Sequence, residues 1–179
     1  MTRQKTTQQN NHQLKFIANP AGSIIADIGD TLPGNALWLP CHRQAVVEAI
    51  AAGGFDALLP ARAADNLPEM VEKQLRRECL ALIALAKKSG VLIAGYEKVR
   101  GEIASGHISL LIQANDSRGR QLFLPNNSKP PVLLFSSDEL SAVIGRQHVV
   151  YIALKSGKLT DTLRVATGRL TEYNTNNQL

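Results

Sequence analysis

The sequence predicts an α/β protein, with a C-terminal three-layer α/β/α sandwich built on a mixed sheet and a small α/β unit at the N-terminus. From about residue 68 onwards, apolar residues at helical spacing alternate with short, fully apolar runs. Such runs indicate strands that helices cover on both faces. The chain has 179 residues, of which 44% are hydrophobic and 20% are charged. This composition predicts one or two folded units with a real core.

The N-terminal unit is expected to span residues 14–62. Three β-like segments separated by turns are predicted at Leu14–Ala18, Ser23–Ile28 and Ala36–Leu39, the last containing Trp38, which we expect in the core. A helix from His42 to Ala52 follows, because apolar residues recur at helical spacing and the pair Gly53-Gly54 stops them.

The chain ends and the linker are predicted from composition. The polar opening, residues 1–13, has too little apolar surface to offset the entropy of ordering it, which predicts a disordered tail. Residues 60–68 mix Ala, Asp, Asn and Pro without periodicity, so we expect a linker over residues 63–72 and a boundary near residue 68. The C-terminal domain then covers residues 73–172, with a second tail at 173–179.

The C-terminal domain is expected to open on a long helix from Pro68 to Ser89, with one apolar stripe that includes Leu75, Cys79 and Ile83. Lys87 and Lys88 near its end suit the helix dipole, and Gly90 caps it. Strands are predicted at 91–93, 108–114, 132–135 and 149–154, and further helices at 96–105, 117–124, 138–144 and 159–170.

Positive charge is concentrated in the C-terminal part. The chain carries a net +5, yet residues 1–72 have five basic against seven acidic residues, whereas residues 73–179 have fifteen against eight. A basic half beside a mildly acidic half indicates that one module faces a polyanion. The alternative stays open, because many basic proteins bind no nucleic acid.

Membrane insertion and export are not expected. The longest apolar run, Cys79–Ala86, is eight residues long, against the roughly 18 that a membrane helix requires. The opening residues lack the apolar stretch of a signal peptide. Two distant cysteines cannot build a disulfide framework, so we expect a cytoplasmic protein that does not contact the membrane.

Catalysis is not expected either. Cys41 and His42 are adjacent on an extended chain and therefore point to opposite faces. The four histidines have no metal-ligand spacing, and the segment after Gly95 lacks the Gly-Lys-Ser/Thr ending of a phosphate-binding loop. We predict no enzyme activity, no cofactor, no metal and no small-molecule substrate.

Two stretches resemble known families. Residues 80–117 and 132–154 resemble the L-seven-Ae superfamily of kink-turn RNA-binding ribosomal proteins and their bacterial relatives. The marks are the glycine pair Gly95 and Gly106, the strand end Ala114-Asn115-Asp116, and the SDELSAVIG segment of residues 137–145. Residues 14–50 resemble the core of the YlxR family of small bacterial RNA-associated proteins. Chains that join two such parts are usually described as nucleic-acid-binding proteins connected with transcription termination or translation.

The resemblance implies RNA contacts at the start of the second helix and at the loop after residues 137–145. Aligned without gaps between the two glycines, Glu97, Lys98 and Gly101 stand where the family has the Asn, Glu and Lys that read the kink-turn guanine. The N-terminal part also departs from its family, because it lacks the Cys-containing, Arg-rich opening and has Asn35 in place of an Arg. Both departures remove positive charge, so this unit is expected to have lost RNA contact surface.

Residue chemistry supports the same site. A helix that begins after Gly95 offers free backbone N–H groups and a positive dipole end to a phosphate or a base. An Arg can pair bidentately with a guanine edge, while Lys acts as a point charge. The candidate RNA-binding residues are Gly95, Tyr96, Glu97, Lys98, Arg100, Lys87, Lys88, Gly145, Arg146, Gln147 and His148. From residue types alone, Tyr96 also fits the core, and the remaining residues also fit a solvated helix and a surface turn.

The functional expectation is an RNA-binding protein for structured RNA, ribosomal or small non-coding and including kink-turns, connected with the ribosome, translation or transcription termination. Aromatic residues make up 4% of the chain, which argues against stacking many single-stranded bases. The alternative is a protein–protein adaptor on the ribosome or transcription machinery that keeps the fold without RNA recognition.

Overall fold

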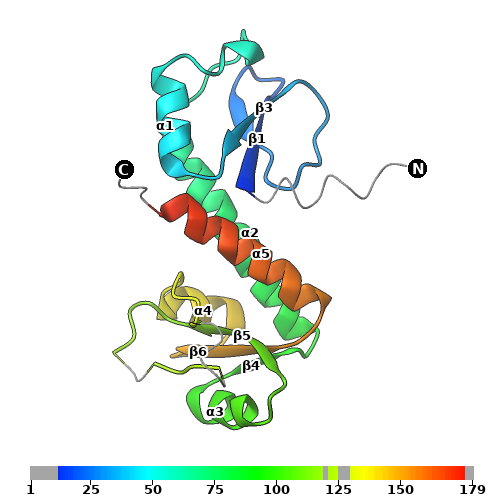
Figure 1. Ribbon diagram of the computed structural model, residues 1–179, viewed down its shortest axis with the longest axis vertical. Coiled ribbons are helices and arrows are strands. Elements are labelled where there is room, and N and C mark those ends of the chain that lie inside the picture. The colour runs from blue at the N-terminus through cyan, green and yellow to red at the C-terminus, as the bar shows by residue number, and fades with distance from the viewer. Residues whose placement is uncertain (1–11, 119–120, 125–129, 176–179) are drawn as a thin grey trace, which may run out of the picture. The chain divides into compact units, whose positions relative to one another are not determined.

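The computed structural model describes residues 12–118, 121–124 and 130–175, and it contains both helices and strands, as predicted (Figure 1). The strands are β1 (Gln13–Ala18), β2 (Ile24–Ala26), β3 (Ala36–Pro40), β4 (Leu92–Ala94), β5 (Ile108–Gln113) and β6 (Tyr151–Lys155). The helices are α1 (Arg43–Ala51), α2 (Leu67–Lys88), α3 (Tyr96–Ala104), α4 (Ser137–Ile144) and α5 (Lys158–Asn174), with a short 3-10 turn η2 (Asp56–Leu58).

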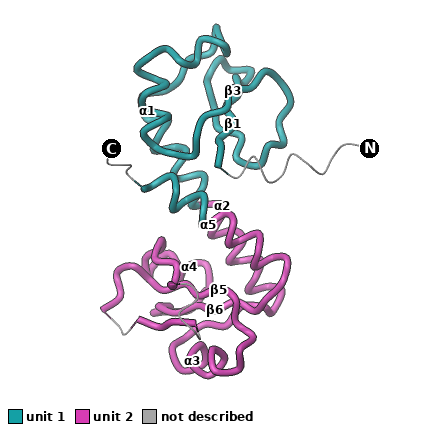
Figure 2. Tube along the Cα trace, in the orientation of Figure 1, with its two compact units in different colours: residues 1–76, 168–179 teal, residues 77–167 magenta. Residues whose placement is uncertain are grey.

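The chain divides into two compact units, coloured separately in Figure 2. Unit 1 comprises residues 1–76 and 168–179, and unit 2 comprises residues 77–167. Helices α2 and α5 therefore contribute residues to both units. The division falls inside these helices, rather than near residue 68 and residue 172 as the sequence predicted.

Unit 1 contains an antiparallel sheet with the strand order β2-β1-β3. The central strand β1 buries Leu14 and Phe16 completely, and the Phe16 ring lies 5.4 Å from the Phe55 ring in an edge-on arrangement. Strand β3 is an edge strand, and its residues from 36 to 39 are half-buried. Trp38 therefore lies at the margin of the core rather than inside it.

The predicted linker over residues 63–72 is wrong, because α2 begins inside it at Leu67 and buries Leu67 and Val71. The segment before α2 is packed as well, since Ala61 is buried. The main chain of Arg62 donates to the Gly22 carbonyl at 3.0 Å and accepts from the Ile24 N–H at 3.0 Å. Isolated apolar residues without periodicity can still be buried one at a time, and a search for periodicity does not detect them.

Both predicted tails extend too far into the chain. Gln13 belongs to β1, and residues 1–11 lie outside the described residues. At the other end, Tyr173 is completely buried, and its hydroxyl donates to the Pro68 carbonyl at 2.8 Å. The predicted tail over residues 173–179 is therefore wrong at Tyr173, which is part of the unit 1 core, while residues 176–179 lie outside the described residues.

A buried ion cluster fixes the loop between β2 and β3. The Lys15 ammonium donates to the Asp30 carboxylate at 2.8 Å and lies 3.0 Å from the Asp27 carboxylate. The Asp27 carboxylate also accepts hydrogen bonds from the backbone N–H groups of Thr31, at 3.1 Å, and Leu32, at 2.9 Å. Because Lys15 and Asp27 are both less than a tenth exposed, the loop closes over them.

We expect unit 1 to lose stability in acid through Asp27. Burial raises the pKa of this carboxyl, but the backbone donors of Leu32 and Thr31 and the Lys15 ammonium outweigh it, so the pKa lies below its usual value of 3.8. A carboxyl whose pKa is lower in the folded than in the unfolded chain stabilises the folded state at pH values above the unfolded pKa. This stabilisation is lost as the pH falls below about 4. Trp38, the single tryptophan, stands opposite Lys15 in the sheet and reports unfolding of this unit.

Urea unfolding followed by Trp38 fluorescence at pH 7 and at pH 3 tests this expectation. The wild-type midpoint should fall between the two pH values by more than that of Asp27→Asn, since the variant has no carboxylate to protonate. An acid shift of equal size in both proteins would contradict the role of Asp27.

Unit 2 is built on an antiparallel sheet with the order β4-β6-β5. The predicted strand over residues 132–135 is not a regular strand; it lies beside β5, where the Val132 N–H donates to Leu111 at 2.9 Å and the Gln113 N–H donates to Val132 at 3.0 Å. The bridge between Ile112 and Val132 is parallel, so the sheet is mixed at this edge only. Pro130 and Pro131 precede it and have no N–H groups to extend the pairing.

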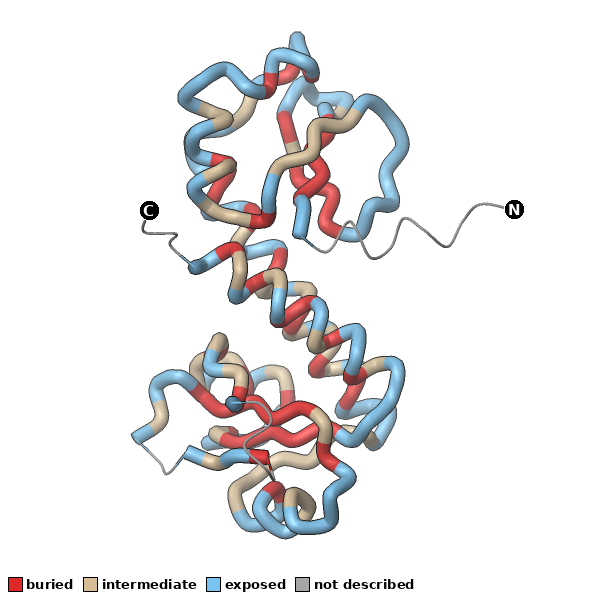
Figure 3. The backbone as a smooth tube through the Cα atoms, in the orientation of Figure 1, coloured by how far each residue is buried: buried red, intermediate tan, exposed pale blue. Residues whose placement is uncertain are grey.

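Helices cover the two faces of this sheet, with α3 on one side and α4 on the other (Figure 1). On the α3 side, Val99 packs with Leu111 of β5 and with Tyr151 and Ala153 of β6. Within this sheet, the buried residues lie in β5 and β6, whereas β4 is half-buried (Figure 3). The arrangement has the three layers that the alternating pattern predicted.

The helix predicted over residues 117–124 is wrong, because none of its described residues is helical. Side-chain contacts hold the residue before this segment and its last residue. The Asp116 carboxylate accepts the N–H and the hydroxyl of Ser137, both at 2.9 Å, and Leu124 is buried in the core beneath α3. Within the described residues, no helix combines the length and the apolar character that crossing a membrane would need.

Candidate nucleic-acid interface

Gly95 forms the start of α3. Its φ of 102° is a conformation that glycine adopts readily and that side chains disfavour. The Gly95 N–H donates to the Tyr151 carbonyl at 2.9 Å, which joins the helix start to β6. As the N-cap residue, Gly95 has no side chain to cap the helix, and a Cβ on Gly95 would meet no atom within 4 Å. The first-turn N–H groups of α3 therefore face a space that a ligand can approach closely.

The side chains of the first turns of α3 divide into two groups. Lys98 is exposed. Arg100 is engaged within its own helix, because its guanidinium lies 2.9 Å from the Glu97 carboxylate and 5.6 Å from the centre of the Tyr96 ring. Tyr96 itself is half-buried against the core, with its ring 5.3 Å from that of Tyr151. Tyr96 and Arg100 thus form a contacting pair on α3, whereas Lys98 has no hydrogen bond or ion pair with any residue that the structure describes.

The loop after α4 is held by that helix. Gly145 ends α4 in the left-handed conformation, and its N–H donates to the Ser141 carbonyl at 2.8 Å. The Ser141 hydroxyl accepts the Val149 N–H at 2.9 Å, so one residue fixes both ends of the loop. Val149 is buried, whereas residues 145–148 are exposed, with His148 at a φ of 54°. This anchoring projects Arg146, Gln147 and His148 from the surface.

The two segments meet at a small pocket. It has a volume of about 160 Å³ and is lined by Ala94, Gly95, Arg146, Gln147, His148 and Val149. The glycine at the helix start and the arginine-bearing loop are therefore neighbours, although about fifty residues separate them in sequence. A positive helix end, a guanidinium, a carboxamide and an imidazole around one hollow provide donors for phosphate oxygens and for base edges.

Of the two predicted lysines at the end of α2, one joins this region. The Lys87 ammonium donates to the Ile144 carbonyl at 2.6 Å, and a Cβ on Gly145 would lie 3.5 Å from it. The Lys87 ammonium neutralises the negative C-terminal end of α4. Through its bond to Ile144 it also holds the residue that precedes the loop of residues 145–148. Lys88 is exposed, and no contact of the described residues brings it to the pocket.

Ser141 and Tyr151 are residues of this region that the sequence analysis missed. The sequence pattern placed Ser141 in a predicted helix and Tyr151 in a predicted apolar strand, without a role at this site. A serine five residues before an Arg-bearing turn could have suggested the capping role of Ser141, because serine hydroxyls often bind nearby backbone groups. No sequence signal pairs Tyr151 with Tyr96.

The described residues contain no group of three or more His, Cys, Asp or Glu side chains arranged to hold a metal ion. Burial raises the pKa of the Cys41 thiol to about 11, so the nucleophilic thiolate is disfavoured near neutral pH.

Unit 2 has twelve basic against seven acidic residues in its sequence, whereas unit 1 has eight of each. The surplus of positive charge therefore lies in unit 2, the unit that contains the pocket between Gly95 and the Arg146 loop.

Comparisons with protein families and with curated proteins found no match to this chain.

Proposed function

We propose that this chain binds structured RNA through unit 2. The observation that carries the proposal is the pocket shared by Gly95 and residues 146–149, with the uncapped start of α3 on one side and the Arg146 loop on the other. Kinked or irregular RNA exposes base edges that a regular A-form groove hides, and a helix end can reach them. Connection with the ribosome, translation or transcription termination, and preference for kink-turns, are parts of this proposal.

Each element of the interface has a distinct task in this proposal. The N–H groups of the first turn of α3 bind phosphate or a base acceptor where Gly95 permits close approach. Lys98 contributes backbone affinity as a point charge, and Arg146 contributes a planar fork of donors for a base edge. Lys87, Tyr96 and Arg100 position these groups.

The salt dependence of affinity tests the proposal against a protein adaptor. The probes are a kink-turn RNA hairpin and a regular duplex of the same length, titrated with the full chain by fluorescence anisotropy from 50 to 300 mM salt. Contact with about four to six phosphates should give a log–log slope of roughly −3 to −5. We expect the kinked RNA to bind more tightly than the duplex at every salt concentration.

Two outcomes would contradict the proposal. One is a slope near zero, because a mainly apolar association hardly responds to salt. The other is the absence of saturable binding to either RNA at 50 mM salt. Either would favour the adaptor.

A further inference from the structure

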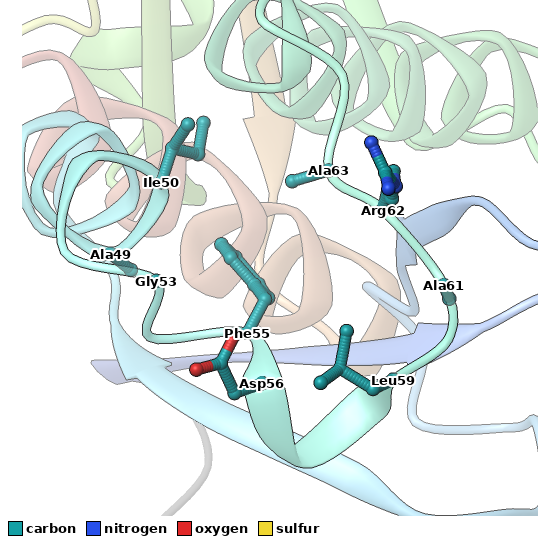
Figure 4. Close-up of a pocket in the computed structure, with 9 residues that line it drawn as sticks. All are labelled: Ala49, Ile50, Gly53, Phe55, Asp56, Leu59, Ala61, Arg62 and Ala63. Atoms are coloured by element: carbon teal, nitrogen blue, oxygen red, sulfur yellow. The ribbon is translucent and has the colours of Figure 1, made fainter.

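Unit 1 contains a second pocket, distant in sequence from the candidate RNA site. Its volume is about 230 Å³, and its lining, labelled in Figure 4, includes Ile50, Gly53, Phe55, Asp56, Leu59 and Arg62. The lining comes from the end of α1, from η2 and from the segment that leads to α2. All of these residues lie in unit 1, so the pocket belongs to that unit alone.

The pocket has an apolar middle and a charge of opposite sign at each end. Figure 4 shows Asp56 near Gly53 at one end and Arg62 at the other, with Phe55 and Leu59 between them. Leu59 is 65% exposed, more than any other large apolar residue of unit 1 within residues 12–76 and 168–175. An exposed leucine on the rim of a hollow gives apolar surface that a bound partner would remove from water.

The two charged groups of this pocket are available. Among the described residues, neither the Asp56 carboxylate nor the Arg62 guanidinium has a side-chain hydrogen bond or an ion pair. Three other cations of unit 1 are engaged. Lys15 binds Asp27 and Asp30, Arg43 binds Glu69 and Glu72, and Arg169 donates to the Ile28 carbonyl at 3.0 Å.

This charge arrangement disfavours a polyanion in the pocket. Unit 1 has equal numbers of acidic and basic residues, and Asp56 would repel a phosphate placed beside Arg62. A partner that complements the pocket must instead carry both signs of charge, one at each end. The volume is below the roughly 300–1,000 Å³ of pockets for drug-sized ligands, so it suits a single large apolar side chain.

We propose that this pocket is a docking site for a protein segment with one large apolar side chain between a basic residue and an acidic residue. The apolar side chain fills the hollow between Ile50, Phe55 and Leu59. The basic residue pairs with Asp56, and the acidic residue pairs with Arg62. Interfaces commonly obtain most of their affinity from one such buried anchor, while charges at the rim set orientation and partner choice. This inference does not depend on RNA binding by unit 2.

Selection from a displayed library of random 12-residue peptides on the full chain tests the proposal. We expect the enriched peptides to share an apolar residue with a basic residue on one side and an acidic residue on the other. A synthetic peptide of the enriched sequence should then bind Leu59→Ser and Asp56→Lys at least about tenfold more weakly than the wild type. The charge-exchanged double variant Asp56→Lys/Arg62→Glu should bind the same peptide more tightly once its basic and acidic residues are interchanged.

The controls are Leu32→Ser and Asp65→Lys, which change an exposed apolar residue and an exposed acid of unit 1 outside the pocket. Both should bind the peptide as the wild type does, and Trp38 fluorescence should show that all variants are folded. Enrichment of no common pattern, or equal affinity of the peptide for Asp56→Lys and the wild type, would overturn the proposal. A loss of RNA affinity in Arg62→Glu of tenfold or more would identify the occupant as RNA and would also overturn it.

Discussion

Replacing Lys98 and Arg146 together by glutamate should lower the affinity of the chain for structured RNA by about a thousandfold. Each substitution exchanges an attraction of about 1 kcal/mol to a nearby phosphate for a repulsion of similar size. Two substitutions then change the binding free energy by about 4 kcal/mol, and every 1.4 kcal/mol is a factor of ten. Anisotropy with the kink-turn hairpin at 100 mM salt measures the change.

The matched control for this prediction is Arg100→Gln. Arg100 belongs to the same helix but is paired with Glu97 and lies over Tyr96, so its removal should change RNA affinity less than tenfold. Both variants should retain the wild-type unfolding midpoint, because the altered residues are exposed. A double glutamate variant that binds within threefold of the wild type would eliminate this surface as the RNA site.

Removing the ring of Tyr173 should destabilise unit 1 by about 3–5 kcal/mol, the usual cost of truncating a buried aromatic residue to alanine. Tyr173 is completely buried near the end of α5. Burial raises the pKa of its hydroxyl, which stays neutral and donates to Pro68. Urea unfolding of Tyr173→Ala, followed by Trp38 fluorescence, measures the loss.

Two further variants separate packing from the hydrogen bond. Tyr173→Phe keeps the ring but leaves the buried Pro68 carbonyl without its donor, so we expect a smaller loss of about 1–3 kcal/mol. Met70→Ala, an exposed substitution in the same unit, should change stability by less than about 0.5 kcal/mol. An unchanged midpoint in Tyr173→Ala would mean that the end of α5 does not contribute to this core.

The regular elements follow closely from local patterns. The apolar stripe with Leu75, Cys79 and Ile83 predicted α2, and all three side chains are buried. The apolar run from Ile108 predicted β5, whose residues are buried on both faces. These predictions succeed because a helix or a strand that buries one face must repeat apolar residues with its own period.

The wrong predictions concern segments whose structure depends on single contacts rather than on a repeated apolar pattern. Residues 63–72 were predicted as a linker, but Leu67 and Val71 are buried in α2, and Ala61 before that helix is buried as an isolated apolar residue. The chain after β5 was predicted as a helix, but it is held by Asp116 on Ser137, twenty-one residues further along. Single long-range contacts leave no repeated signal in the sequence, so pattern analysis cannot find them.

The candidate RNA site was predicted only in outline. The sequence indicated a glycine-led helix start and an Arg-bearing loop, and the structure places Gly95 and Arg146 on one pocket. The individual tasks depended on side-chain geometry, since Arg100 is engaged by Glu97 and Lys87 supports the end of α4. Residue type predicts which groups carry charge, but only packing decides which of these charges stay available.

By itself, the sequence determined the α/β class, most of the helices and strands, and the concentration of positive charge in the C-terminal part. Tertiary structure alone decided the limits of the units, since residues 168–179 belong with residues 1–76. It also decided that Asp56 and Arg62 stand at opposite ends of one hollow. The physical reason is that periodicity and charge are local properties of the chain, whereas burial and pairing depend on residues that only folding brings together.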